Sequence, residues 1–249
     1  MSMLFTTSWD DGHPMDLRTA QILERCGATG TFYVCRDGQA GQTLSNGELR
    51  DLAKRHEIGA HTLTHPRLPE LPYAAQMEEM RGSKAWLEDV LGKECLMFAY
   101  PYGAVDASAR DCALAAGFRG ARTTVDVSWD LLDPFLLPTS VQLHTFPLRP
   151  ILDRRIIQPI REKRPRLRAI GISLIQCRSW FSMATAVFRY ALCTHQPYFH
   201  LWGHSWSTDQ YGMWDDLERF LRFVNSHDGI RHGTNRELTT LAPSGSVSK

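Results

Sequence analysis

Carboxylates and histidines, which together often bind divalent metal ions, gather in three short segments of the chain. The segments are SWDDG at residues 8–12, HTLTH at 61–65 and HLWGHS at 200–205. Two imidazoles and one carboxylate can hold a metal ion and leave coordination positions open for water and substrate. The ion lowers the pKa of its bound water, so that a nucleophile is available near neutral pH. These residue types therefore indicate metal-assisted hydrolysis.

Only one of the two HxxxH segments is predicted to share an ion. His200 and His204 lie in an apolar run typical of a strand, where residues four apart are separated by roughly 13 Å. His61 and His65 leave a short apolar run and enter a polar turn before Pro66, where a single helical turn would bring both imidazoles together. We therefore place His61 and His65 in the metal site and interpret His200 as structural. The alternative for the first pair, a capping and a core histidine, is disfavoured by the nearby carboxylates.

The overall composition is that of an ordinary soluble globular protein. The chain has 249 residues, with 28 Lys and Arg against 27 Asp and Glu, and its net charge of +1 creates no field that would attract nucleic acid. Its six cysteines include no CxxC pair, which is typical of reduced thiols. The N-terminal segment lacks the features of a secretory signal, and no apolar run approaches the roughly 20 residues of a membrane span. The sequence thus predicts a cytoplasmic protein that does not bind nucleic acid, and it carries no sign of the oligomeric state.

Apolar runs alternate with helical patterns along the chain. This alternation predicts a parallel α/β sheet or barrel, in which reactive groups lie at the carboxyl ends of the strands. We predict one domain over residues 1–240 and a disordered tail at 241–249. The predicted strands are 3–8, 29–35, 57–61, 96–100, 119–123, 135–139 and 198–204.

Residues 149–168 interrupt this rhythm with eight Lys and Arg and two acidic residues. The favoured interpretation is a solvated helix face that covers part of the core. Because isoleucines lie among the arginines, a second hypothesis is a basic amphipathic surface. Such a surface would contact a phosphate-bearing substrate, or the inner face of the membrane in a peripheral manner.

The segments SWDDG, HTLTHP and FAYPYG, in this order, resemble the first three motifs of the polysaccharide deacetylase family, also called the NodB-homology or carbohydrate esterase 4 family. LWGHS resembles the late LxH segment of that family, and FAYPYG resembles the form found in a subgroup. The resemblance covers about residues 3–225 outside the basic segment. It implies a distorted (β/α) barrel of about seven parallel strands and a divalent ion, usually zinc. It also implies removal of N-acetyl groups from an amino-sugar-containing oligo- or polysaccharide or glycan precursor.

The resemblance further implies a role for each motif residue. It places the metal ion on Asp11, His61 and His65. Asp10 corresponds to the general base that takes a proton from water at the metal. His204 corresponds to the general acid that protonates the leaving amine, a task that suits an imidazole near pH 7.

Residues around these motifs are predicted to form the substrate groove. The backbone N–H of Tyr102 corresponds to the family's oxyanion donor, and Pro101 beside it is predicted to shape one wall. Trp9, Trp202 and Trp206 are candidates for stacking on a sugar ring. For each tryptophan, burial in the core is the alternative.

The third motif departs from the commonest family pattern, which reads like FRPPYG. Ala99 stands where the family has an arginine that pairs with the catalytic Asp, so the partner of Asp10 is open. The segment VDVSWDLLDP at residues 125–134 resembles the fourth motif only loosely. The sequence does not rank its candidates, which are Asp126, Asp130 and Asp133.

Two alternative functions remain at this point. The first is hydrolysis of a cyclic amide or another non-sugar C–N bond by the same fold. The second is a carbohydrate-binding protein whose catalysis has lapsed, and the missing arginine at Ala99 is its only support. The leading interpretation is a metal-dependent deacetylase whose partner is an N-acetylated carbohydrate substrate.

Overall fold

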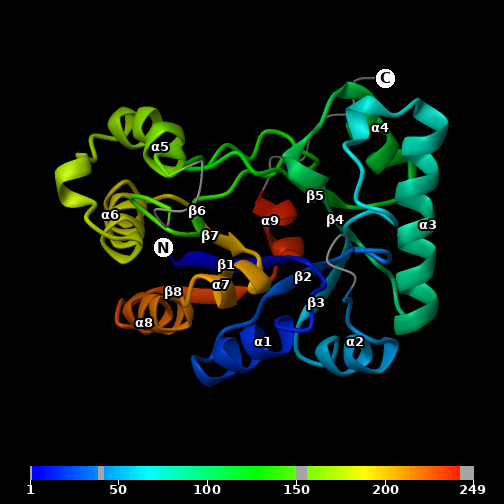
Figure 1. Cartoon of the computed structure of the whole chain (residues 1–249), viewed down its shortest axis with the longest axis horizontal. Helices are drawn as coiled ribbons and strands as arrows, with labels where there is room; N and C mark the ends of the chain where they lie inside the picture. The colour runs from blue at the N-terminus through cyan, green and yellow to red at the C-terminus, as the bar shows by residue number, and fades with distance from the viewer. Residues whose placement is uncertain (1, 39–41, 150–155, 242–249) are drawn as a thin grey trace.

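The computed structural model describes residues 2–38, 42–149 and 156–241, in which a parallel sheet is surrounded by helices (Figure 1). The strands are β1 (Met3–Asp11), β2 (Thr31–Val34), β3 (Glu57–Ala60), β4 (Met97–Ala99), β5 (Gly120–Arg122), β6 (Val141–Leu143), β7 (Tyr198–Gly203) and β8 (Ile230–Gly233). The helices are α1 (Asp16–Arg25), α2 (Asn46–Leu52), α3 (Tyr73–Leu91), α4 (Ala107–Ala115), α5 (Gln158–Ala169), α6 (Trp180–Cys193), α7 (Ser205–Gln210), α8 (Trp214–Asn225) and α9 (Asn235–Leu241), with short 3₁₀ turns η1 (Leu68–Glu70), η2 (Pro101–Gly103) and η3 (Leu174–Gln176). Within these ranges no helix is both long and apolar enough to cross a bilayer.

The sheet confirms the predicted α/β distorted barrel. Its strand order is β5-β4-β3-β2-β1-β7-β6, and every pairing is parallel. The first half of β1 also pairs with β8, whereas its second half pairs with β2. Because all strands run in one direction, their carboxyl ends meet at one edge, as predicted for the reactive groups.

Two details of the strand prediction are wrong. Residues 135–139 form no strand, and only Leu137 makes an isolated bridge, to Arg122. Pro138 has no N–H to donate to a ladder, and β6 begins three residues after it. The strand β8 was not predicted, because its sequence IRHG has little apolar character.

The alternation of side chains along β1 decides which residues can reach the site. Phe5 and Trp9 belong to the core between the sheet and the helices. Ser8 and Asp10 point to the opposite face, inside the barrel, where the Ser8 hydroxyl lies 2.9 Å from Nε2 of His200. The first carboxylate of SWDDG is therefore directed into the barrel.

The basic segment forms α5, which lies beside α6 at the upper left of Figure 1. Leu167 is fully buried on one side of this helix, and Arg161 and Arg164 are exposed on another. Residues 150–155 of the predicted basic segment lie outside the described residues, as do residues 242–249 of the predicted tail. The described part thus agrees with a helix that covers core and exposes a basic face.

Candidate active site

A tight turn at the end of β1 separates the two adjacent carboxylates. Asp11 has a φ of 82° and Gly12 a φ of 69°, so the chain reverses its side-chain direction immediately after Asp10. A Cβ on Gly12 would lie 2.6 Å from Cγ1 of Val34, and only glycine fits there. Asp10 points into the barrel, and the carboxylate of Asp11, in the turn, lies beside His61 and His65.

The HxxxH segment brings its imidazoles together, but not by the predicted helical turn. Thr62 and His65 both have positive φ values, 69° and 59°, and the segment after β3 is a bend. The Thr62 hydroxyl accepts a hydrogen bond of 3.0 Å from the backbone N–H of His65 and stabilises this bend. The Nε2 atoms of His61 and His65 lie 3.2 Å apart.

Asp11, His61 and His65 form a set of converging ligand atoms. Oδ1 of Asp11 lies 3.4 Å from Nε2 of His65 and 3.7 Å from Nε2 of His61, and one ligand atom from each residue lies within 4.8 Å of the others. Two nitrogens bound to a tetrahedral zinc ion at about 2.0–2.1 Å stand roughly 3.3 Å apart, so the spacing fits a shared ion. Nδ1 of His61 donates to the carbonyl of Ala99 at 2.7 Å, which leaves Nε2 as the ligand atom.

The electrostatics of this set favour metal binding. Burial lowers the pKa of His61 to about 4, so its imidazole is neutral near pH 7. Burial works to raise the pKa of Asp11, but the hydrogen bond with His65 and the nearby imidazoles of His204 and His61 hold it well below its usual range. The residues therefore offer a carboxylate and a neutral imidazole at one point.

Two residues that follow β7 lie near Oδ2 of Asp11, the carboxylate oxygen that does not face His61 and His65. His204 is the N-cap of α7, and its Nε2 lies 3.9 Å from Oδ2 of Asp11. The indole N–H of Trp206, the second residue of α7, donates to the same oxygen at 2.8 Å. Trp206 thus orients Asp11 so that Oδ1 faces the two histidines, a contact that the sequence did not predict.

Asp10 has a cationic partner that the motif did not reveal. Nη2 of Arg122, at the end of β5, lies 2.5 Å from both carboxylate oxygens of Asp10. The side chain of Arg122 has no exposed surface, and that of Asp10 is 4% exposed. The arginine at the carboxyl end of the predicted strand 119–123 is the sequence feature that could have indicated this partner.

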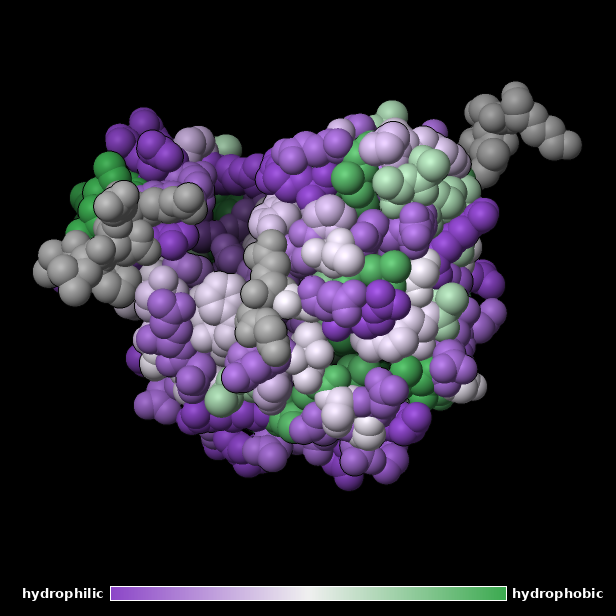
Figure 2. Space-filling view, turned by 45° about the vertical axis from the view of Figure 1, so that its right-hand side comes forward, coloured by the Kyte–Doolittle hydropathy of each residue, from purple (hydrophilic) through white to green (hydrophobic). Residues whose placement is uncertain are grey.

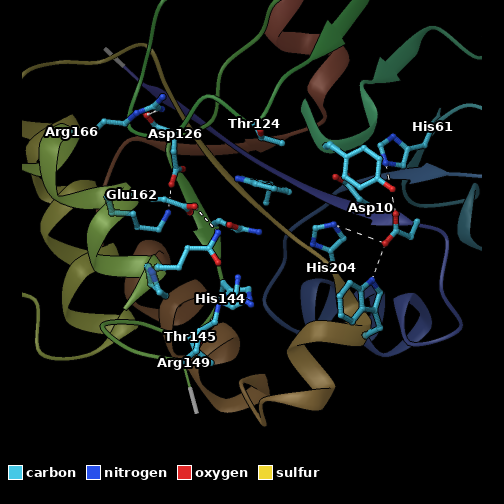
Figure 3. A pocket seen from close by; sticks show the side chains of 18 of the residues that line it. Asp10, His61, Thr124, Asp126, His144, Thr145, Arg149, Glu162, Arg166 and His204 are labelled. Carbon is cyan, nitrogen blue, oxygen red and sulfur yellow. Dashed lines mark hydrogen bonds and ion pairs between the residues drawn. The ribbon is translucent and has the colours of Figure 1, made fainter. Parts of the chain in front are cut away.

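These groups line one end of a cavity of about 630 Å³. We call the part around Asp10, Asp11, His61, His65 and His204 the metal end (Figure 3). Opposite lies the α5 end, formed by β6, the loop after it, Asp126 and one face of α5 (Figure 3). Its polar and charged residues are Asp126, His144, Thr145, Arg149, Gln158, Glu162, Lys163 and Arg166. Figure 2 shows a hollow with hydrophilic walls on this part of the surface.

Comparisons with known proteins agree with this geometry. Residues 4–121 match the family model described as polysaccharide deacetylase. This region, just under half of the chain, is similar to the polysaccharide deacetylase family. This similarity supports the predicted enzyme class, a polysaccharide deacetylase-like hydrolase of amide bonds. The matched residues include every predicted metal ligand but neither Arg122 nor His204.

Solved structures of the family share the fold at low sequence identity. A protein from Mycobacterium smegmatis assigned to the polysaccharide deacetylases is 14% identical, with a TM-score of 0.67 over 97% of this chain and 90% of that one. A mutant of a carbohydrate esterase family 4 pseudoenzyme with restored activity is 14% identical, with a TM-score of 0.59 over 96% and 68%. A polysaccharide deacetylase from Bacillus cereus is 22% identical, with a TM-score of 0.47 over 53% of this chain and only 45% of that chain. The search of curated proteins found no match.

The predicted substrate contacts divide into two groups. Tyr102, Trp202 and Trp206 line the cavity, and Trp206 is 38% exposed. Trp9 and Pro101 are buried and do not line it, so their predicted contact with a sugar is wrong. The alternation of β1 turns Trp9 towards the helices.

Of the three aspartates left open by the sequence, one reaches the cavity. Asp126 lines its α5 end and pairs with Lys163. Asp130 accepts a hydrogen bond from the backbone of its own loop, and Asp133 pairs with Arg110 at 2.9 Å. The latter two therefore have structural roles, as does His200, which is fully buried between hydroxyl groups of β1.

Proposed function

We propose that this protein removes N-acetyl groups from an amino-sugar-containing oligo- or polysaccharide or glycan precursor, with a divalent ion, zinc, on Asp11, His61 and His65. The observation that carries the proposal is the convergence of these three ligand atoms beside a separate, buried carboxylate, Asp10, in one cavity. Metal-assisted amide hydrolysis needs both a metal site and a base beside it that does not bind the metal.

The donor set supports zinc and leaves positions open. One carboxylate and two imidazoles are ligands typical of catalytic zinc sites, which keep a position for water. When bound, the ion would activate water and polarise the amide carbonyl. The hydrogen bonds from His61 to Ala99 and from Trp206 to Asp11 hold two of the ligands in orientation before any ion arrives.

The other groups of the metal end have complementary tasks. Asp10, held by Arg122, accepts the proton of the attacking water. His204 donates a proton to the leaving amine from the other side of Asp11. Tyr102 has a φ of 59° in the turn after β4 and lines the cavity, where its backbone N–H would stabilise the developing oxyanion.

The structure favours an active enzyme over a sugar-binding protein with lapsed catalysis. That alternative depended on the missing arginine at Ala99, and Arg122 supplies a cation at the same carboxylate. The α5 end also favours a hydroxyl-rich substrate over a small cyclic amide, because it extends the cavity with amide, carboxylate and guanidinium groups, which suit hydrogen bonds to sugars.

The exposed side of α5 supports a further part of the proposal. Arg161, Arg164 and Arg168 are exposed on this helix, and Ile157 just before it is 61% exposed. We propose that this face contacts the phosphate of a glycan precursor at the inner face of the membrane, in a cytoplasmic protein. Neutralising the three arginines should reduce pelleting with anionic vesicles, and unchanged pelleting and activity would contradict this part.

The central experiment measures acetate release from N-acetylated chitooligosaccharides, with cyclic amides tested in parallel. Zinc-loaded protein should release acetate, and thorough chelation should abolish this release until zinc is restored. His204→Asn should lose most turnover while it retains the metal, because the leaving amine is then not protonated. His195→Asn, which changes an exposed histidine outside the cavity, is the matched control. Turnover that survives chelation would refute the proposal. Turnover of cyclic amides alone would show that the substrate is a cyclic amide and not an N-acetylated sugar.

A further inference from the structure

The structure brings three cations and two carboxylates to the α5 end of the cavity. The cations are Arg149, Lys163 and Arg166, and the carboxylates are Asp126 and Glu162. Figure 3 shows Arg149 and Arg166 on the side of the cavity opposite to the metal end. The exposed arginines of α5 that we propose to contact a membrane do not line the cavity. The positive groups inside it therefore need a separate explanation.

Asp126 holds two of these cations in place and neutralises only one. Its carboxylate pairs with Lys163 and also accepts a hydrogen bond of 3.3 Å from the hydroxyl of Thr139. Its backbone carbonyl accepts a hydrogen bond of 2.5 Å from Nη1 of Arg166. A carbonyl carries no formal charge, so this bond orients the guanidinium group and leaves its charge in place. A guanidinium group has five N–H donors, so the other donors of Arg166 can serve a ligand.

The period of α5 gives the cavity a wall of polar groups. Gln158, Glu162 and Arg166 follow one another at intervals of four residues and therefore lie on one face of the helix. Nε2 of Gln158 donates to Oε1 of Glu162 at 2.5 Å. Oε1 of Gln158 is inaccessible to solvent, and no group in the described part of the chain donates to it. This amide oxygen is therefore placed to accept a hydrogen bond from a sugar hydroxyl.

His144 shows the sign of the electrostatic potential at the α5 end. This residue follows β6 and lines the cavity, and its Nδ1 lies 3.1 Å from the hydroxyl of Thr145. Burial is the main cause that lowers the pKa of His144, and the positive charges of Arg149, His204 and Lys163 lower it further. Nearby cations disfavour a protonated imidazole, and the same cations attract an anion.

We propose that the α5 end binds an anionic substituent, a phosphate or a carboxylate, of the glycan whose N-acetyl group is hydrolysed at the metal end. This inference rests on the proposed function. Arg149 and Arg166 donate paired N–H groups to the oxygens of the anion, and Lys163 adds a third positive charge. The cavity volume of about 630 Å³ lies within the range of roughly 300–1,000 Å³ that holds a whole small ligand. The substituent is therefore carried by the acetylated sugar or by a residue linked to it.

Substrates that differ in charge test the inference. They are neutral N,N′-diacetylchitobiose, N-acetylglucosamine 1-phosphate, and a disaccharide of N-acetylglucosamine and glucuronic acid. Zinc-loaded wild-type protein should show a kcat/KM at least about tenfold higher for one of the two anionic substrates than for the neutral one. This preference should shrink when NaCl is raised from about 50 mM to about 500 mM, because salt screens the attraction.

Variants of Arg166 connect this preference to the α5 end. Arg166→Gln should raise KM for the preferred anionic substrate about tenfold, while KM for the neutral substrate changes less than about threefold. Arg166→Lys keeps the charge and should retain part of the preference, although lysine lacks the planar fork. Arg178→Gln is the matched control, since it removes the charge of an exposed arginine that does not line the cavity.

A binding measurement makes the test independent of turnover. Metal-free protein is titrated calorimetrically with N-acetylglucosamine 1-phosphate, because a bound zinc ion would itself attract phosphate oxygens. Arg149→Gln/Arg166→Gln should weaken this binding at least about tenfold and leave zinc affinity unchanged. If the uronate disaccharide is the preferred substrate, it replaces the sugar phosphate in the titration. Thermal unfolding reports whether the double variant folds, and Arg166→Gln alone is used if it does not.

The outcomes separate this inference from the proposed function. Wild-type protein that releases acetate from none of the three substrates would refute the proposed function. Turnover of the neutral substrate without any preference for an anionic one would refute the inference alone. A preference that persists in the folded Arg149→Gln/Arg166→Gln variant would also refute it. Preference for the sugar phosphate or for the uronate supports it and identifies the substituent as a phosphate or a carboxylate.

Discussion

The two ends of the cavity hold their charged groups in different ways. At the metal end, Asp10 and His61 are nearly inaccessible to solvent and held by donors or acceptors from neighbouring strands. At the α5 end, Glu162 and Arg166 are exposed on a helix surface. Fixed, buried groups suit a reaction that needs a defined geometry, whereas long exposed side chains adapt to the shape of a ligand. We therefore expect chemistry at the first end and substrate recognition at the second.

The largest effect should come from loss of a metal ligand. His65→Gln should reduce zinc affinity more than about 100-fold, because one of the three ligand atoms is removed. Lys163→Gln, at the α5 end, should leave zinc affinity unchanged. Calorimetric titration of metal-free protein measures both. Similar losses of zinc affinity in the two variants would contradict the assignment of metal binding to the metal end.

A smaller loss is expected when a metal ligand loses its orientation. Trp206→Phe removes the donor to Oδ2 of Asp11 but keeps an aromatic ring in the cavity. Zinc affinity should fall about 10- to 100-fold, as for other hydrogen-bond partners of metal ligands. Trp214→Phe is the matched control, because it removes an indole bond to Asp209 outside the cavity. An unchanged affinity in Trp206→Phe would assign this tryptophan to substrate contact alone.

At the α5 end, the expected effect is on substrate binding. The variant Lys163→Met/Asp126→Asn removes an ion pair whose side chains are 12% and 15% exposed, without leaving either charge alone. KM for chitooligosaccharides should rise about fivefold, which corresponds to about 1 kcal/mol, and kcat should change less than twofold. Steady-state kinetics with Lys54→Met, on an exposed pair with Asp51, provides the control. A fivefold loss in kcat would instead indicate that this pair contributes to the catalytic step.

The smallest expected effect is on the pH dependence of the unfolding free energy, through His144 at the α5 end. Burial lowers the pKa of His144 to about 4 from an ordinary value of 6.5. The unfolded chain therefore binds this proton at a higher pH than the folded chain does. The stability contributed by neutral His144 is present above pH 6.5 and is lost as the pH falls towards 4. Between pH 7 and pH 6 the loss should be on the order of 1 kcal/mol.

Urea unfolding at several pH values measures this contribution of His144 to the free energy of unfolding. His144→Asn should show a shallower decline of unfolding free energy below pH 7 than the wild-type protein, and His195→Asn should match the wild type. An identical pH dependence in His144→Asn would show that His144 is solvated in the folded protein.

The convergence of Asp11, His61 and His65 could be predicted from the sequence, because the fold class brings strand ends together and the resemblance to the deacetylase motifs singled out Asp11 from the two carboxylates. Asp11 follows the first predicted strand and His61 ends the third, which lie on either side of β2, and parallel strands deliver their carboxyl ends to one edge. The local conformation could not be predicted. The positive φ values of Asp11, Thr62 and His65 are unusual for residues other than glycine, and they occur because the surrounding contacts impose them.

Local sequence patterns could not reveal hydrogen-bond partners that lie far away in the sequence. Arg122 is 112 residues from Asp10, and Trp206 is 195 residues from Asp11. The register of β4 with β5 and the short turn between β7 and α7 bring each donor to its carboxylate. Trp9 shows the opposite case, because its proximity to the motif in sequence suggested a role that the alternation of β1 excludes.

By itself, the sequence determined the kinds of groups that are present and the strand ends that carry them, because residue type and hydrophobic period are local properties. Only the tertiary structure decided how the adjacent carboxylates of SWDDG differ. Asp10 is held by an arginine of β5, and Asp11 by a tryptophan of α7. The physical reason is that a buried charge is oriented by whichever donors the folded chain places within hydrogen-bond distance, and that distance is set by strand register.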